Sequence, residues 1–445
     1  MRCLQPARTR IRRLSIGRLI SVTGGAAAYT ALNFTVWQRT HSPTMQALTL
    51  LLTFGVAGLL GSFAGALGDR FDRKRVMIWS EAISAAFFFG MAVAHAPGTL
   101  ILLAFGSAVA ELPFFSASRA AIPNLVESED QVSWANSLVT MSVHAGIAVG
   151  PVVGGLLLVP LGASTVFALN AITFCVSILL TVSVRGSFQQ SRTARADEED
   201  EHVGILAGLV YLWHEPVLRR LSIAWFVFVL GMGMSMVADA PLAASFGVGP
   251  VGFALLITCW GTGSVLGAGA GRFMNPRTEP VWLVVASFGI AAAAFGVGFA
   301  PVFPIALVSL LIMGTADGMT MVAENGIMQR RTPDAVRSRT MAAFEAVLSL
   351  GLVIAYLLAG PVLRAVGAQP VYRLGGLTAL LAAVALTPLV RLRREPQPDR
   401  SAEVLAAPRY TSAEALDGEP TAALAPGWGL NAVQDPARTL ASGDG

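Results

Sequence analysis

The chain has 445 residues, of which 54% are hydrophobic and 13% are charged, and its mean hydropathy is +0.64. This composition excludes a water-soluble globular protein, because soluble domains carry about 25% charged residues. The net charge of +4 gives no reason to expect a nucleic-acid partner, so the lipid bilayer is the partner that the composition predicts.

Apolar segments of roughly 20 residues, the length that crosses a bilayer as a helix, recur along the chain. We predict twelve transmembrane helices, because glycines within these segments favour closely packed helices over β-strands, which would alternate apolar and polar residues. The first six helices are expected near 14–37, 44–67, 76–95, 99–118, 135–158 and 163–184, and the second six near 221–240, 251–271, 281–299, 303–323, 340–362 and 371–390.

This order predicts an all-α membrane protein with two pseudo-symmetric six-helix bundles, at residues 1–184 and 221–390. The segment between them, 185–220, mixes charges with an amphipathic middle and is expected to be a cytoplasmic linker that contains a surface helix. Residues 391–445 are rich in Pro, Ala, Gly and Ser without apolar periodicity, which is typical of a disordered tail.

Lys and Arg residues indicate the orientation, because short cytoplasmic loops retain them and translocated loops lose them. Of the 31 Lys and Arg residues, only Arg39, Arg364 and Arg373 fall in connections from an odd-numbered to an even-numbered helix. All the others lie near the N-terminus, in the opposite connections, in the linker or in the tail. We therefore predict an inner-membrane protein with both termini in the cytoplasm.

The two halves also resemble each other, as in transporters built from internal repeats. A shift of 202 residues places the Gly-rich segment 61–70 on the segment 263–272. A shift of 206 residues aligns the segment after the fourth helix with the segment after the tenth. Both shifts agree with the independent division into six plus six helices.

The loop between the second and third helices reads GSFAGALGDRFDRKRVM, from Gly61 to Met77. Glycines on one helix face let a neighbouring helix approach closely, and the charged turn that follows can form ion pairs in one conformation and lose them in another. A carboxylate at a helix end can also cap the positive N-terminus of a neighbouring helix. The run resembles motif A of the major facilitator superfamily, which implies a cytoplasmic gate. The gate residues would be Gly65, Asp69, Arg70, Arg73 and Lys74.

The fifth helix contains GIAVGPVVGGL, from Gly146 to Leu156. A proline inside a helix removes a backbone hydrogen bond and kinks it, while glycines on the same face allow tight packing, so this segment is a candidate pivot. The pattern resembles motif C of antiporters in the same superfamily, in which it accompanies export rather than uptake. The matching residues are Gly146, Gly150, Pro151, Gly154 and Gly155.

Asp72, in place of the second glycine of motif A, looks like the drug:proton antiporter group that includes macrolide and enterobactin exporters. The resemblance implies a monomeric multidrug efflux transporter without a cofactor, whose partners are a small amphipathic substrate, protons and the bilayer. One departure concerns proton coupling. Many proton-coupled relatives have an arginine inside the fourth helix, whereas here that helix has none before Arg119.

Ionisable residues at membrane depth cost about 3 kcal/mol each and usually line an aqueous path. Glu111 in the fourth helix and Asp317 in the tenth are related by the shift of 206 residues. They are candidates to take up protons or attract a cationic substrate, and the alternative is that each pairs with a nearby arginine or caps a helix. His144 can titrate at physiological pH or serve as a packed core residue. Asp239, near the outer end of the seventh helix, is a candidate for a gate or a substrate contact.

Aromatic and thioether side chains suit a cavity that accepts varied amphipathic molecules, although most such residues in membrane proteins pack against lipid or other helices. The candidates for cavity residues are Asn33, Trp37, Phe228, Met232 and Trp260.

A membrane enzyme is the first alternative from another class, but the scattered histidines form no metal motif and the chain has no P-loop, so we expect neither metal nor ATP chemistry. A proton-coupled uptake symporter is the main alternative among transporters. A receptor that does not transport would keep the helices while losing the two motifs. The preferred interpretation is a secondary active exporter that works by alternating access in exchange for protons.

Overall fold

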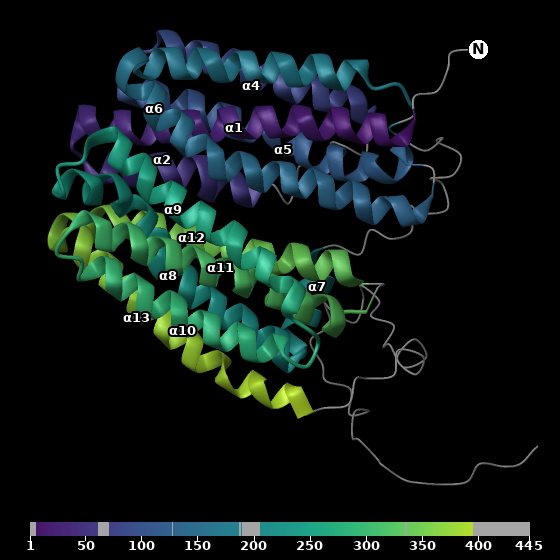
Figure 1. Ribbon diagram of the computed structural model, residues 1–445, viewed down its shortest axis with the longest axis vertical. Helices are drawn as coiled ribbons and strands as arrows, with labels where there is room; N and C mark the ends of the chain where they lie inside the picture. Colours follow the sequence, from purple (N-terminus) through teal and green to yellow (C-terminus); the bar gives the residue numbers. More distant parts are fainter. Residues whose placement is uncertain are drawn as a thin grey trace, which may run out of the picture. The chain divides into compact units, whose positions relative to one another are not determined.

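The computed structural model describes residues 6–60, 71–126, 128–186, 188, 205–333 and 336–394. Every regular element in these ranges is a helix (Figure 1). The predicted all-α fold is therefore confirmed. The described residues belong to one compact unit.

The helices before the central segment follow the predicted order, and several begin or end outside their predicted bounds. The second predicted helix contains a π-helical turn and is described as far as residue 60, and the fourth extends to Leu125. The elements are α1 (Ala7–Thr40), α2 (Pro43–Leu50), η1 (Leu51–Val56), α4 (Arg73–Val93), α5 (Pro97–Leu125) and α6 (Glu129–Ser183).

The element α6 contains two of the predicted membrane crossings. Its 55 residues are interrupted at Gly162, whose φ of 74° and ψ of 166° are not helical. This conformation is open to glycine because it has no Cβ. The break separates the two predicted helices at 135–158 and 163–184.

The helices after the central segment also follow the predicted order. A glycine with positive φ, Gly367 at 84°, again stands between the last two long helices. The elements are α7 (Ile205–His214), α8 (Pro216–Ser245), α9 (Gly249–Ala270), η4 (Gly271–Phe273), α10 (Glu279–Gly298), α11 (Phe303–Arg331), α12 (Arg337–Val366), α13 (Ala368–Leu386) and η6 (Thr387–Arg394).

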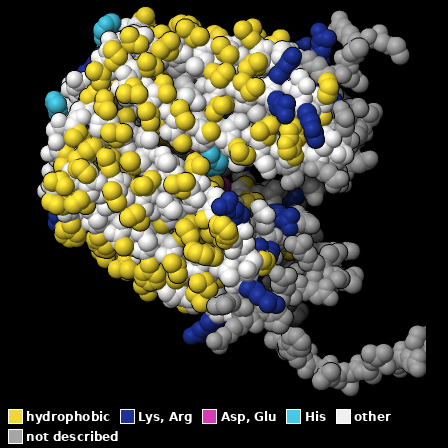
Figure 2. All heavy atoms as spheres, viewed as in Figure 1, with side chains coloured by type: hydrophobic (Ala, Val, Ile, Leu, Met, Phe, Trp, Pro, Cys, Tyr) yellow, Lys and Arg dark blue, Asp and Glu magenta, His cyan; other side chains and the backbone are white. Residues whose placement is uncertain are grey.

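Length and hydropathy make the protein a multi-pass membrane protein. In the described parts, 11 helical stretches are long and apolar enough to cross a membrane, and one of them is the doubly crossing α6. Hydrophobic side chains cover most of the face in Figure 2, and Lys and Arg gather toward the helix ends near α7. Such an apolar exterior suits lipid rather than water.

The helices pack closely because small residues lie between them. On α9, a Cβ added at Gly267 would be 2.8 Å from the Thr315 carbonyl carbon of α11. On α11, a Cβ added at Gly318 would be 2.7 Å from the Ala268 backbone nitrogen of α9. Backbone contacts of this kind replace the hydrophobic driving force that is missing between helices in lipid.

One large buried cluster includes residues from both sides of the central segment. It joins Leu50 of α2 to Phe253 of α9, Tyr356 of α12 and Tyr372 of α13. The helix α7 lies within the predicted linker, and the division into two bundles on either side of that linker stays a prediction. The predicted disordered tail, from residue 395 onward, lies outside the described residues.

Candidate functional site

The described part of the motif A segment ties α4 to its neighbours. Arg73 donates a hydrogen bond to the Ala120 carbonyl oxygen near the end of α5, at 2.8 Å. The Lys74 ammonium donates to the Val182 and Val184 carbonyl oxygens at the end of α6, at 2.9 and 2.8 Å. Cations suit these places because helix C-termini carry partial negative charge. The other candidates of this motif, Gly65, Asp69 and Arg70, lie outside the described residues.

The motif C glycines lie where α6 touches two other helices. A Cβ at Gly146 would be 2.8 Å from Val22 of α1. Cβ atoms at Gly150 and Gly154 would meet the α1 backbone around Thr23 and Ala27, and a Cβ at Gly155 would meet Ala254 of α9. Pro151 lies in the same helical segment. This segment therefore contacts one helix on each side of the linker.

A charged cluster that the sequence analysis did not identify lies among α1, α4, α5 and α6. Arg18 is 7% exposed, and its guanidinium lies 4.9 Å from the Phe114 ring centroid and 4.4 Å from that of Phe115. It interacts electrostatically with Glu111 and Glu81. The structure thus places the predicted Glu111 beside a buried arginine from α1.

Glu81 is the most deeply buried acid of this cluster, with 1% exposure. Its Oε1 accepts a hydrogen bond of 2.5 Å from the Ser177 hydroxyl of α6. Its Oε2 has no hydrogen-bond partner among the described residues. A small pocket beside the cluster is lined by Arg18, Phe114, Ser177 and their neighbours.

Sequence reasoning missed Arg18 and Glu81, although a signal was present. Arg18 stands inside the predicted helix 14–37, and Glu81 inside the predicted helix 76–95. Charged residues several positions inside an apolar segment are costly and point to a buried partner. Their partners, however, come from helices that are distant in the sequence.

Asp317 lies among other acids. Within the described residues, no interaction joins it to Glu111. Glu324 of α11 interacts electrostatically with Glu345 of α12 and with Asp317. Glu345 in turn interacts with Arg119 of α5. Among the described residues, no group of three His, Cys, Asp or Glu side chains is placed to hold a metal ion.

Asp239 accepts a hydrogen bond from the Tyr372 hydroxyl of α13. Tyr356 of α12 and Tyr29 of α1 interact electrostatically with this carboxylate. Asp239 is therefore placed inside a group of tyrosines from several helices. Its predicted role as a gate or substrate contact stays a prediction.

The predicted cavity residues pack around the large buried cluster. The Asn33 Oδ1 accepts a buried hydrogen bond of 2.8 Å from the Gln46 side-chain amide. His144 lies half-buried in α6, two residues before Gly146. The partly buried residues that pack against the cluster include Trp37, Phe228, Met232 and Trp260.

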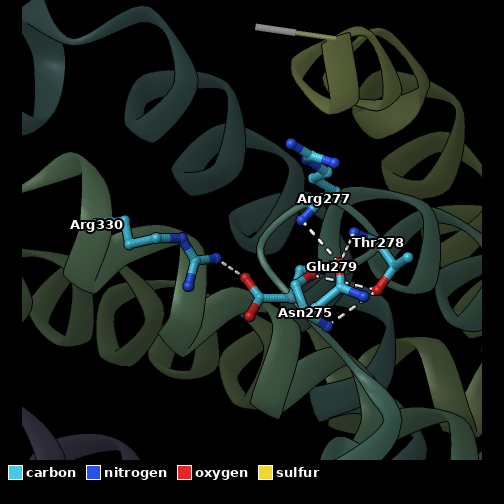
Figure 3. Close-up of polar contacts among 5 residues, drawn as sticks. All are labelled: Asn275, Arg277, Thr278, Glu279 and Arg330. Atoms are coloured by element: carbon cyan, nitrogen blue, oxygen red, sulfur yellow. Dashed lines mark hydrogen bonds and ion pairs between the residues drawn. The ribbon is translucent and has the colours of Figure 1, made fainter. Parts of the chain in front are cut away.

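An ion pair joins the start of α10 to the end of α11 (Figure 3). The Glu279 carboxylate, in the first turn of α10, forms an ion pair with Arg330, in the last turn of α11. The preceding loop is held by the Asn275 side chain, which accepts hydrogen bonds from the Arg277 and Thr278 backbone nitrogens at 3.1 Å. Both charges suit the partial charges of the helix ends that carry them.

The many membrane crossings and the charged side chains buried between them define a membrane transporter. The chain belongs to the Major Facilitator Superfamily, whose sequence model matches residues 14–337 and 221–433. The predicted family is therefore confirmed.

Relatives of known activity are similar over most of the chain. A multidrug efflux pump, Tap, from Mycolicibacterium fortuitum is 27% identical over 352 residues, which cover 74% of this chain and 83% of the relative. The enterobactin exporter EntS of Shigella boydii serotype 18 is 23% identical over 337 residues, with 74% and 79% coverage.

Solved structures confirm the fold. A bacterial homologue of the human lysosomal transporter Spinster, in an inward-facing and unoccupied conformation, aligns with a TM-score of 0.69, 15% identity and coverage of 89% of this chain and 100% of that one. The D323A mutant of the nucleoside transporter NupG aligns with a TM-score of 0.68, 14% identity and coverage of 85% and 99%.

Proposed function

We propose that the protein is a secondary active exporter of small amphipathic molecules that works by alternating access in exchange for protons. The observation that carries this proposal is the presence of buried or half-buried carboxylates on membrane-spanning helices on both sides of the central segment: Glu81 and Glu111 on one side, and Asp239, Asp317 and Glu324 on the other. Intramembrane carboxylates with a few defined partners are typical of proton-linked transporters.

Export is supported by the motif C segment and by the two relatives. This segment packs against α1 through three glycines and against α9 through Gly155. A displacement of α6 therefore changes its contacts with helices on both sides of the linker. A transporter that alternates between two access states needs such a contact. Multidrug and enterobactin export by the relatives favours amphipathic substrates.

Uptake in symport with protons is the second candidate. The favouring observation is that solved structures with the same fold include a nucleoside transporter and peptide transporters. These structures are 14% and 12% identical to this chain, so the similarity shows a shared fold alone. A transport experiment decides the direction.

The test measures movement of fluorescent drugs and siderophores into inverted membrane vesicles that contain the protein. We expect accumulation when the vesicle interior is acidified and a loss of accumulation when a protonophore is added. Accumulation in right-side-out vesicles driven by an inward proton gradient would instead establish uptake. The variant Glu111→Gln with Asp317→Asn tests the acids: full retention of proton-driven transport would exclude both as coupling residues.

The orientation is part of the same proposal. We expect both termini in the cytoplasm, so that protease sites added at either end are cleaved only in inverted vesicles.

A further inference from the structure

We propose that Arg18, Glu81 and Glu111 form a proton-binding site within the first half of the chain, in which Glu81 holds the proton. The inference rests on the proposed function, because it names the site of the coupling ion. It differs from the expectation based on sequence alone, in which Glu111 and Asp317 were the candidate carboxylates.

The burial of Glu81 is the first step of the argument. A carboxylate that is 1% exposed needs hydrogen bonds or a counter-charge to remain ionised. Oε1 has the Ser177 hydroxyl, whereas Oε2 has no hydrogen-bond partner among the described residues. A proton on this carboxyl group neutralises the buried charge without requiring any movement of the helices.

The net charge of the side chains around Glu81 favours the binding of one proton. Arg18 is the guanidinium that interacts electrostatically with both acids. Arg119 of α5 also faces this cluster, but it interacts with Glu345 of α12 as well. From α6 the facing group is the uncharged Ser177 hydroxyl. Within the proposed site, two carboxylates thus share the Arg18 guanidinium group, and one added proton makes these three side chains neutral.

The position of Arg18 explains how this proton can influence transport. Arg18 stands four residues before Val22, which faces Gly146 in the contact between α1 and α6. Loss of the proton leaves one uncompensated negative charge beside this contact, and binding of a proton removes it. The balance is one O–H bond formed on Glu81 when a proton enters from one side, and the same bond broken when it leaves on the other.

The side chain that interacts electrostatically with Glu111 comes from α1, at position 18, and its guanidinium lies 4.9 and 4.4 Å from the Phe114 and Phe115 ring centroids of α5. The Arg18 guanidinium of α1 therefore provides the positive charge next to α5.

Infrared spectroscopy of the purified full-length chain in lipid tests the site without any substrate. The probe is the carbonyl band of protonated carboxyl groups, recorded while the pH is raised from acidic to alkaline. In the wild type we expect a component that disappears on alkalinisation. In Glu81→Gln this component is expected to be absent, because the amide keeps the shape and the Ser177 contact but cannot ionise.

Matched variants separate a proton site from a structural contact. Glu111→Gln should retain the titrating component. Ser177→Ala should move its disappearance to higher pH, because the lost hydroxyl no longer stabilises the ionised form. Elution of each variant as a single folded species in gel filtration controls for misfolding. An unchanged component in Glu81→Gln would overturn the proposal.

Vesicle transport then distinguishes the two proposals. If the wild type shows no proton-driven movement of any tested drug or siderophore, the proposed function fails. If the wild type shows it and Glu81→Gln retains at least half of the rate, the function stands and the assignment of Glu81 fails. We expect Glu81→Gln to lose proton-driven accumulation at least tenfold.

Discussion

The N-terminal ends of α4 and α10, which lie in equivalent places of the repeat, contact their neighbouring helices with opposite chemistry. The shift of 206 residues that aligns the segments after the fourth and tenth helices also places Arg73 on Glu279 and Ala120 on Gly326. In the first half, the Arg73 guanidinium donates to the Ala120 carbonyl oxygen. In the second half, the Glu279 carboxylate pairs with Arg330.

The comparison shows that the position of a contact can persist while its polarity is reversed. The acid in the second half needs space that the arginine does not: a Cβ at Gly326 would be 2.7 to 2.9 Å from the Glu279 carboxyl atoms. In the first half the equivalent residue is Ala120, which keeps its Cβ and offers its backbone oxygen. The residue opposite each helix end, Ala120 or Gly326, therefore matches the side chain of that end, Arg73 or Glu279.

The largest expected effect comes from Glu279→Ala. The Glu279 and Arg330 side chains are 10% and 30% exposed, so the variant removes a partly buried ion pair. We expect the free energy of unfolding to fall by about 3 kcal/mol. The measurement is the thermal unfolding midpoint in detergent, with Arg277→Ala, an exposed change in the loop before α10, as the control. Equal midpoints for the two variants would contradict the importance of the ion pair.

Gly326→Ala sharpens the comparison from the opposite side. The added methyl group forces the Glu279 carboxylate to move, and overpacking of this kind costs about 2 kcal/mol. Gly269→Ala in α9 is the control, because a Cβ there meets nothing within 4 Å. In a chain that already carries Glu279→Ala, the Gly326→Ala change should cost much less. Additive losses in the double variant would show that the methyl group clashes with something other than the carboxylate.

Arg73→Met tests the first-half contact with a smaller expected effect. The loss of the hydrogen bond to Ala120 should lower the free energy of unfolding by about 1 kcal/mol. Arg75→Met, an exposed change two residues away, is the control and should unfold as the wild type does. A loss of unfolding free energy as large as that of Glu279→Ala would show that the two contacts contribute equally to stability despite their different chemistry.

The smallest expected effect is that of Asp72→Ala. The Asp72 side chain accepts a hydrogen bond of 2.9 Å from the Arg75 backbone nitrogen and caps α4. Removal of an exposed cap should cost about 0.5 kcal/mol, and Asp72→Asn, which keeps the acceptor, should restore most of it. Thermal midpoints that rank Asn below Ala would contradict the capping role.

The features that repeat along the chain were predictable from the sequence. Apolar length gave the order of the helices, and the charged and Pro/Gly breaks placed the boundaries to within several residues, although α5 continues beyond its predicted end at 118 to Leu125. The glycines at 146, 150 and 154 were singled out by their spacing, which puts them on one helix face. The family resemblance rested on motifs that are contiguous in the sequence.

The charged cluster was not predictable in the same way. Arg18, Glu81 and Ser177 come from three helices, and their meeting depends on how those helices are rotated about their axes. Helix periodicity assigns each residue to a face but does not say which face meets which neighbour. The same limitation applies to Asp239, whose partner Tyr372 lies 133 residues further along the chain.

Two of the glycines with positive φ, Gly162 and Gly367, have a consequence for the biogenesis of the protein. Gly162 and Gly367 each join the last two crossings of a half through a turn so short that no hydrophilic loop stands between the helices. We expect each such pair to enter the bilayer as one helical hairpin, because little polar backbone stands between its two helices. We then expect the basic residues that flank each hairpin to determine its orientation during synthesis.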